Sequence, residues 1–254
     1  MSPDRIPPPP ATRPDRGDTG RPACGRVLFV GCGPGAADLL TLRAVRALAA
    51  ADIVVWSPSL IAAEVVREHV RPGTEILAWP PAALPDVLDA FDRARDRGLV
   101  VVRLKGGDPM LFGAMEPELG AARDRGLDVE IVPGVSALGA AAAALGWEIA
   151  RPGTPLLVGD AVEAPGGEVG VTALFMAGGG PGAAAAGLRQ RGMRPDASCA
   201  VAIHVSCADE ILVTCRLDEL TEHVEDLGRG GHTLVLVRAK PAGETAASGS
   251  APTD

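Results

Sequence analysis

The sequence contains no tyrosine, and its only lysines are Lys105 and Lys240. Arginine therefore supplies nearly all of the positive charge, and the formal net charge of the 254 residues is −8. A nucleic-acid-binding surface must neutralise phosphates with basic side chains, so this balance argues against a nucleic-acid partner. A small anionic substrate stays compatible with it, because such a ligand needs only a local group of cations.

Long apolar runs are also missing. No stretch reaches the roughly 18 residues that a membrane-spanning helix needs, so we expect no membrane partner. The first residues, MSPDRIPPPPATRPDRGDTG, lack the apolar centre of a secretory signal. Together with five cysteines and no C-x-x-C pair, this pattern favours reduced thiols and a cytoplasmic protein.

Three of the cysteines, Cys199, Cys207 and Cys215, recur every eight residues, with His204 among them. Closed zinc sites favour ligand pairs that lie closer together in the sequence. We therefore predict small, wholly or partly buried thiols here and no metal site.

Short apolar runs alternate with helix-like stretches through most of the chain. The clearest buried strands are predicted at 26–31 and 99–104, and a glycine follows each of the helices predicted at 85–97 and 118–125. Such strand–helix alternation predicts an α/β fold with a largely parallel sheet and helices on both faces.

A Pro- and Gly-rich segment at 150–170 leads to a second region of the same kind, and we place the boundary near 146–154. In that region we predict strands at 172–176, 200–205, 211–215 and 233–238. The prediction is thus two α/β domains, at 25–148 and 149–240, between disordered tails at 1–24 and 241–254.

The first chemically suggestive segment is VGCGPG at 30–35, between a predicted strand and a predicted helix. Glycines let a ligand approach the backbone, and helix N-termini favour anions. A nicotinamide or flavin oxidoreductase would use such a turn, with an acid at the end of the next strand. The candidate acid, Asp52, precedes its strand instead. The oxidoreductase and a tight turn without ligand both stay open as alternatives.

Two further turns follow predicted strands. RLKGGDPMLFG, at 103–113, exposes backbone at two glycines and carries Asp108, whose carboxylate suits either a cationic ligand or a helix cap. VPGVSAL, at 132–138, opens an alanine-rich helix, with Ser136 as its expected N-cap.

In this order and spacing, the three turns resemble the tetrapyrrole methylase family, which includes uroporphyrinogen-III methyltransferase and the precorrin methyltransferases of the cobalamin pathway. The similar strings are VGCGPGAADLLTLRA, RLKGGDPMLFGA and EIVPGVSALGAAAAALGWE, with CAVAIHVSCADEILVTCRLDEL later in the chain. SPSLIAAEVV and ADEILV are more similar to precorrin-4 methyltransferase, whereas RLKGGDP alone is more similar to uroporphyrinogen-III methyltransferase.

The resemblance implies two α/β domains with mainly parallel or mixed sheets, S-adenosylmethionine in the cleft between them, and a homodimer. It implies C-methylation of a tetrapyrrole, with precorrin-4 as the expected substrate and uroporphyrinogen III as the alternative. By position it assigns these cofactor contacts: Pro34, Gly106, Gly107, Asp108, Leu111, Ser136, Ala137, Met176 and Ala202.

The chain departs from the family pattern at several places. Trp56 and Phe112 stand where relatives often carry tyrosine. Pro117 stands where relatives commonly carry glutamate, between Glu116 and Glu118, and PGTPLLVGD at 152–160 replaces a Gln-Thr stretch. These changes keep a further alternative open, namely a divergent member with another substrate or none.

Methyl transfer from a sulfonium needs positioning and charge stabilisation rather than a nucleophilic side chain. No general base is marked clearly, and His204 is the candidate to test, although a lone histidine on a strand is also compatible with a structural role. For the carboxylates of a tetrapyrrole, the candidate cations are Arg43, Arg46 and Lys105. The alternative is that they are ordinary solvated charges on the surface of helices and loops.

Overall fold

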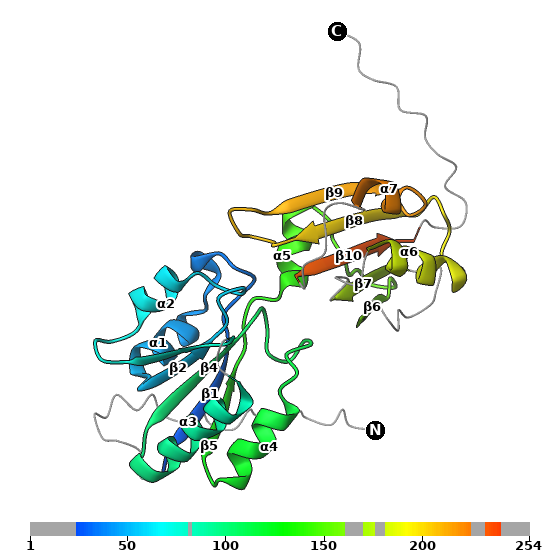
Figure 1. The fold of residues 1–254 in the computed structure, drawn as a ribbon. Coiled ribbons are helices and arrows are strands. Elements are labelled where there is room, and N and C mark those ends of the chain that lie inside the picture. Colours follow the sequence, from blue (N-terminus) through cyan, green and yellow to red (C-terminus); the bar gives the residue numbers. More distant parts are fainter. Residues whose placement is uncertain (1–23, 81–82, 161–169, 176–180, 225–231, 240–254) are drawn as a thin grey trace, which may run out of the picture.

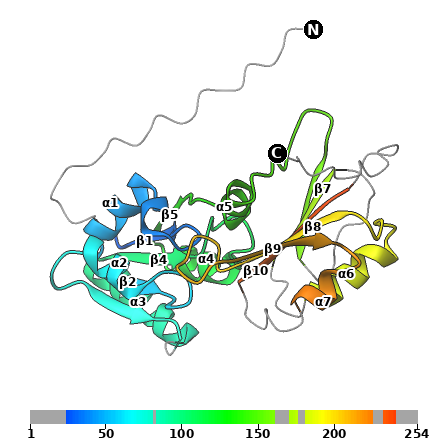
Figure 2. The same ribbon diagram turned by 90° about the horizontal axis from the view of Figure 1, so that it is seen from above.

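A computed structural model describes residues 24–80, 83–160, 170–175, 181–224 and 232–239. The chain forms two five-stranded sheets, one from each half of the sequence (Figure 1). Seen from above, the two halves lie side by side, with α5 between them (Figure 2). The predicted tails at 1–24 and 241–254 lie outside the described residues, apart from Cys24.

All strands of the first sheet are parallel, in the order β3-β2-β4-β1-β5. The strands are β1 (Arg26–Gly31), β2 (Ile53–Trp56), β3 (Glu75–Ala78), β4 (Val100–Lys105) and β5 (Asp128–Val132). The connecting helices are α1 (Leu42–Ala50), α2 (Ala63–His69), α3 (Leu84–Arg97) and α4 (Glu116–Asp124), with a 3-10 turn at Ala37–Leu39.

Helices cover both faces of this sheet, as the alternation predicts. Along β1, Leu28 and Val30 pack in the cluster with α1 and α2. Val27 and Phe29 of the same strand pack on the opposite side, with α3 and α4. Both faces are therefore buried, and the carboxyl ends of the strands stay available for ligands.

The second sheet has the order β6-β7-β10-β8-β9 and is mixed, because only β6 and β7 run parallel. Its strands are β6 (Leu156–Asp160), β7 (Val171–Phe175), β8 (Ser198–Ile203), β9 (Ile211–Arg216) and β10 (Thr233–Arg238). The helices are α5 (Ala137–Ala144), α6 (Pro181–Gln190) and α7 (Leu220–Val224).

Each face of the second sheet also has its own core. α6 and α7 pack on one face through Ala184, Leu188 and Leu220. α5 packs on the other face through Leu138 and Ala141. Although α5 lies within the predicted first domain, it follows β5 directly and supplies core to the second sheet.

One strand was not predicted. No strand is predicted within the Pro- and Gly-rich segment, but its Leu156–Asp160 part is β6, an edge strand parallel to β7. Its residues are partly exposed, so its apolar run is short and hard to distinguish from a loop. Among the described residues, no helix is long and apolar enough to cross a membrane.

Candidate functional site

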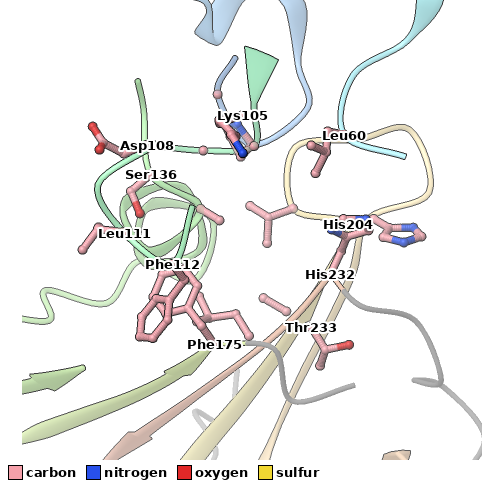
Figure 3. A pocket seen from close by; sticks show the side chains of 18 of the residues that line it. Leu60, Lys105, Asp108, Leu111, Phe112, Ser136, Phe175, His204, His232 and Thr233 are labelled. Carbon is pink, nitrogen blue, oxygen red and sulfur yellow. The ribbon is translucent and has the colours of Figure 1, made fainter. Parts of the chain in front are cut away.

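A cavity of about 270 Å³ lies where the two sheets meet (Figure 3). The first half contributes residues 33–34, 59–60, 105–108, 111–113 and 136–137. The second half contributes residues 175, 202, 204–205, 207 and 232–234. On the first-half side, every contributing loop follows the carboxyl end of a parallel strand, which is where α/β sheets bind ligands.

Glycines bring the turns after β1, β4 and β5 into backbone contact. The N–H of Gly107 donates to the carbonyl of Gly33 at 2.7 Å, and the N–H of Gly33 donates to the carbonyl of Gly107 at 3.3 Å. A Cβ atom on Gly134 would lie 2.1 Å from the Gly107 carbonyl oxygen. A side chain at Gly134 would therefore separate the turn after β5 from the turn after β4.

Asp108 holds two of these turns together. One carboxylate oxygen accepts from the N–H of Met110 at 2.8 Å, and the other accepts from the N–H of Gly134 at 3.1 Å. The sequence suggests a contact to a cationic ligand or a helix cap for Asp108; the structure instead shows its carboxylate joining two turns, and none of the described helices begins there. Asp108 also lines the cavity.

Ser136 caps α5, as predicted, because its hydroxyl accepts from the N–H of Leu138 at 3.2 Å. Ser136 and Ala137 both line the cavity, so α5 begins at its wall. The positive end of the helix dipole therefore lies next to the cavity.

Lys105, one of the cations suggested for substrate carboxylates, lines the cavity but is already paired. Its ammonium lies 2.7 Å from Glu118, which also binds Arg103 through contacts of 2.8 and 3.2 Å. Burial opposes ionisation of Glu118, yet its hydrogen bonds to Arg103 and Lys105 and their charges keep its pKa below the usual value. Burial and the charge of Arg103 lower the pKa of Lys105 against the opposing effect of Glu118.

Pro117 directly precedes the carboxylate of this ion group, which consists of Arg103, Lys105 and Glu118. Pro117 lies in the exposed first turn of α4, a place that suits proline, and Glu118 supplies the buried carboxylate. The other suggested cations, Arg43 and Arg46, lie exposed on α1 and do not line the cavity.

Direct contacts between the two halves lie around the cavity. The rings of Phe112 and Phe175 stack with centroids 4.9 Å apart. The N–H of Ala36 donates to the hydroxyl of Ser206 at 3.0 Å. The first glycine-rich turn and the loop after β4 therefore each contact the second half directly.

Backbone strain is concentrated in the loops beside this cavity. Among the described residues, the non-glycine residues with positive φ are Phe112 at 58°, Ala114 at 46°, His204 at 48° and Ser206 at 66°. Such conformations cost about 1–3 kcal/mol each and tend to persist where surrounding structure enforces them, often at functional sites.

His204 directly follows β8, and both its side chain and its backbone make hydrogen bonds. Its Nδ1 is 2.6 Å from a carboxylate oxygen of Asp209, and its backbone N–H donates to the carbonyl of His232 at 3.3 Å. The two imidazole rings are 5.8 Å apart. Burial, and then the charge of His204, lower the pKa of His232; the hydrogen bond from His204 lowers the pKa of Asp209.

Of the predicted cofactor contacts, Pro34, Gly106, Gly107, Asp108, Leu111, Ser136, Ala137 and Ala202 line the cavity. Met176 lies outside the described residues. The cavity is also lined by four residues that were not predicted: Leu60, Phe175, His232 and Thr233. Thr233 begins β10 and His232 immediately precedes it. The amino end of β10 pairs with the carboxyl end of β8, and this antiparallel pairing could not be inferred from either strand alone.

Asp52 does not reach this site. It accepts from the N–H of Val100 at 2.9 Å and pairs with Arg71, at the amino ends of β2 and β4. The acid of a dinucleotide site would lie at the opposite ends of these strands. No group of three or more His, Cys, Asp or Glu residues within the described parts of the chain could hold a metal ion.

The composition of the cavity lining suits a small organic molecule. Its lining is mostly glycine and apolar side chains, with a few polar groups such as Ser136, Asp108 and Thr233. Small-molecule sites commonly have this composition. At Gly106 a Cβ atom would lie 2.7 Å from Leu60, so a larger residue there would alter the wall.

The sequence profile of the Tetrapyrrole (Corrin/Porphyrin) Methylases matches residues 26–221. The cobalt-precorrin-4 C(11)-methyltransferase of Methanocaldococcus jannaschii is 29% identical over 84% of this chain and 86% of its own length. The precorrin-4 C(11)-methyltransferase of Rhodococcus erythropolis is 37% identical, but the match covers 50% of this chain and 51% of that protein.

Solved structures share the whole fold. A cobalt-precorrin-4 methyltransferase of cobalamin biosynthesis has a TM-score of 0.74 and 26% identity, over 85% of this chain and 96% of its own. The uroporphyrin-III C-methyltransferase of Thermus thermophilus, in complex with S-adenosylhomocysteine, has a TM-score of 0.68 and 27% identity, over 84% and 97% of the two chains.

Proposed function

Because the chain belongs to the tetrapyrrole (corrin/porphyrin) methylase family, we propose that it is an S-adenosylmethionine-dependent C-methyltransferase acting on precorrin-4 or its cobalt-containing form. The position methylated is then C11, as the names of the relatives state. The nicotinamide or flavin alternative loses its support, because Asp52 is a structural residue far from the cavity.

One observation carries this proposal. The three turns that resemble the family's cofactor-binding turns line the cavity. One cobalt-precorrin-4 methyltransferase is similar in sequence over 86% of its length, and a solved structure of such an enzyme is similar over 96% of its chain. Uroporphyrin-III methyltransferase is a structural neighbour as well, with a somewhat lower TM-score.

The bound cofactor supplies an electrophilic methyl group on a sulfonium. The chain's part is to position the reactants, which is the main source of acceleration for such a displacement. Gly106 and Gly107 present backbone to the ligand, Asp108 keeps their turn in place, and the start of α5 closes the floor. The stacked Phe112 and Phe175 cover one side and limit the entry of water.

His204 remains our candidate for accepting a substrate proton. Because Asp209 binds its Nδ1, the other ring nitrogen, Nε2, is left to act as the acceptor. Asp209 is then a positioning residue that fixes the tautomer. His204→Gln is expected to lower kcat about 100-fold, the low end for general-base catalysis, with little change in S-adenosylhomocysteine affinity.

Substrate choice is tested by turnover. The purified protein is given S-adenosylmethionine with enzymatically prepared precorrin-4, cobalt-precorrin-4 or uroporphyrinogen III, and release of S-adenosylhomocysteine is measured. The proposal predicts release with one of the first two. Release with uroporphyrinogen III alone would reassign the substrate, and binding of the cofactor product without release from any substrate would favour a member that has lost its activity.

We also propose a cytoplasmic homodimer. The homodimer rests on the family resemblance, and the compartment rests on the odd number of cysteines without C-x-x-C spacing. Light scattering after gel filtration tests the first point, with twice the chain mass of 25.8 kDa expected.

A further inference from the structure

Two cysteines face each other across the hairpin of β8 and β9. Cys199 and Cys215 are directly paired in the antiparallel register. Directly opposite side chains point to the same face of a sheet, with Cβ atoms about 4.5–5.5 Å apart. The Cα separation of such pairs, about 4.5–5.5 Å, falls in the range that disulfides require, and their Cβ atoms must approach to about 3.5–4.5 Å for the bond to close.

The two thiols have different surroundings. Cys199 is fully buried in the core that α6 and α7 cover, whereas Cys215 lies on the edge strand β9 and is partly exposed. The hydrogen bond between them raises the pKa of Cys199 and lowers the pKa of Cys215. Burial, Glu219 and Asp218 oppose that lowering at Cys215. Cys215 therefore ionises first and is the more accessible nucleophile.

We propose that Cys199 and Cys215 form a reversible disulfide when the protein meets a hydroperoxide, which closes the β8–β9 hairpin at its base. The tip of this hairpin carries His204 and Cys207 to the cavity wall, and Ser206 contacts the first glycine-rich turn there. The bond would thus fix the segment that completes the second-half wall. Formation of this disulfide does not depend on which substrate the protein uses.

The chemistry is balanced by hydrogen peroxide as oxidant. The Cys215 thiolate attacks the O–O bond, and with one proton taken up it yields a sulfenic acid and water. The Cys199 sulfur then displaces the sulfenic hydroxyl, which leaves as water with the Cys199 proton. In total, two thiols and one peroxide give one disulfide and two waters, and two electrons pass from sulfur to oxygen.

The other described cysteines are less suited to this bond. Cys32 is buried, and burial raises the pKa of its thiol to about 12. Cys207 lies in the hairpin tip, 3.9 Å from the carbonyl of Pro34, and burial followed by the charges of Asp209 and Glu210 raises its pKa. Cys24 is exposed and lies before β1.

The test is peptide mapping of the full-length native protein after mild peroxide and blocking of free thiols. Trypsin and a glutamate-specific protease cut after Arg191, Glu210 and Arg216, so fragment 192–210 holds Cys199 and Cys207, while fragment 211–216 holds Cys215. Cys207→Ser is the control that leaves only Cys199 in the longer fragment.

We expect the two fragments to stay joined in the wild type and in Cys207→Ser, to separate on reduction, and to be separate in Cys199→Ser. The wild type and Cys207→Ser carry the conclusion even if Cys199→Ser folds poorly. Fragments joined in the wild type but separate in Cys207→Ser would assign the bond to Cys207. That result, or unlinked fragments bearing blocked or over-oxidised thiols, would overturn the proposal.

Discussion

The carboxylate of Asp108 accepts the backbone N–H of Gly134, a residue 26 positions later in the chain. This bond joins the turn after β4 to the turn that opens α5, and both turns line the cavity. A residue that the sequence marks as a ligand contact is therefore also part of the framework of the site.

Replacing Asp108 is expected to cost stability as well as ligand affinity. Asp108→Ala leaves two backbone N–H groups without their acceptor, so we expect a loss of about 1–3 kcal/mol in the free energy of unfolding. Asp108→Asn keeps one carbonyl acceptor and should lose less. Urea unfolding measures both, with Asp124→Asn on α4 as an exposed control. Equal stability of Asp108→Ala and the wild type would contradict this role.

Glu118 and Glu116 offer a matched comparison within the first turn of α4. Glu118→Gln leaves buried Arg103 and Lys105 without their anion, and we expect the free energy of unfolding to fall by about 3 kcal/mol. Glu116 is exposed, so Glu116→Gln should change it by less than about 0.5 kcal/mol. Similar effects of the two changes would show that the ion group is not stabilising.

Because of the same ion group, we expect the free energy of unfolding to depend on pH in the acid range. The pKa of Glu118 lies below its usual value of about 4.3. Its contribution to stability is complete above that value and is lost as the pH falls through the folded-state pKa. Unfolding measured from about pH 6 to pH 3 should therefore show a shallower loss in Glu118→Gln than in the wild type.

Because of His232, we expect a second pH dependence of the free energy of unfolding, at higher pH. Burial lowers its pKa in the folded chain, with a further effect from His204, so the unfolded chain binds this proton first on acidification. Stability should begin to fall as the pH drops through about 6.5, the usual value for histidine. Between about pH 7 and pH 5, His232→Asn should flatten this slope, whereas His69→Asn on α2 tests for a non-specific effect. An unchanged slope in His232→Asn would contradict the assignment.

The stacked pair of Phe112 and Phe175 should couple the two halves. A double-mutant cycle with Phe112→Leu and Phe175→Leu is expected to give a coupling free energy of about 0.5–1.5 kcal/mol. Thermal unfolding of the four proteins measures it. Additive effects would mean that the contact contributes no coupling.

Much of the fold was predictable because its buried strands are continuous apolar runs. The strands at 26–31 and 233–238 were predicted with the bounds that the structure has. β6 was missed because an exposed edge strand with a Gly-Asp end carries little apolar signal. The pairing order of the second sheet also could not be predicted, since it depends on contacts between residues far apart in the chain.

The first-half side of the cavity was predictable for a related reason. Turns at the carboxyl ends of parallel strands meet at one edge, so Gly107, Asp108 and Ser136 could be grouped from the sequence. The burial of Lys105 against Glu118 could not, because it depends on how α4 packs. His232 lies at the beginning of a strand, where that rule does not apply.

The central claim, that this cavity holds S-adenosylmethionine, is tested most directly by calorimetric titration with S-adenosylhomocysteine. Leu111 lines the cavity, whereas its neighbour Met110 is 64% exposed and is not among the lining residues. We predict micromolar binding by the wild type and by Met110→Trp. For Leu111→Trp we predict affinity at least about tenfold weaker, or about 1.4 kcal/mol. No binding by the folded wild type, or unchanged binding by Leu111→Trp, would contradict the account.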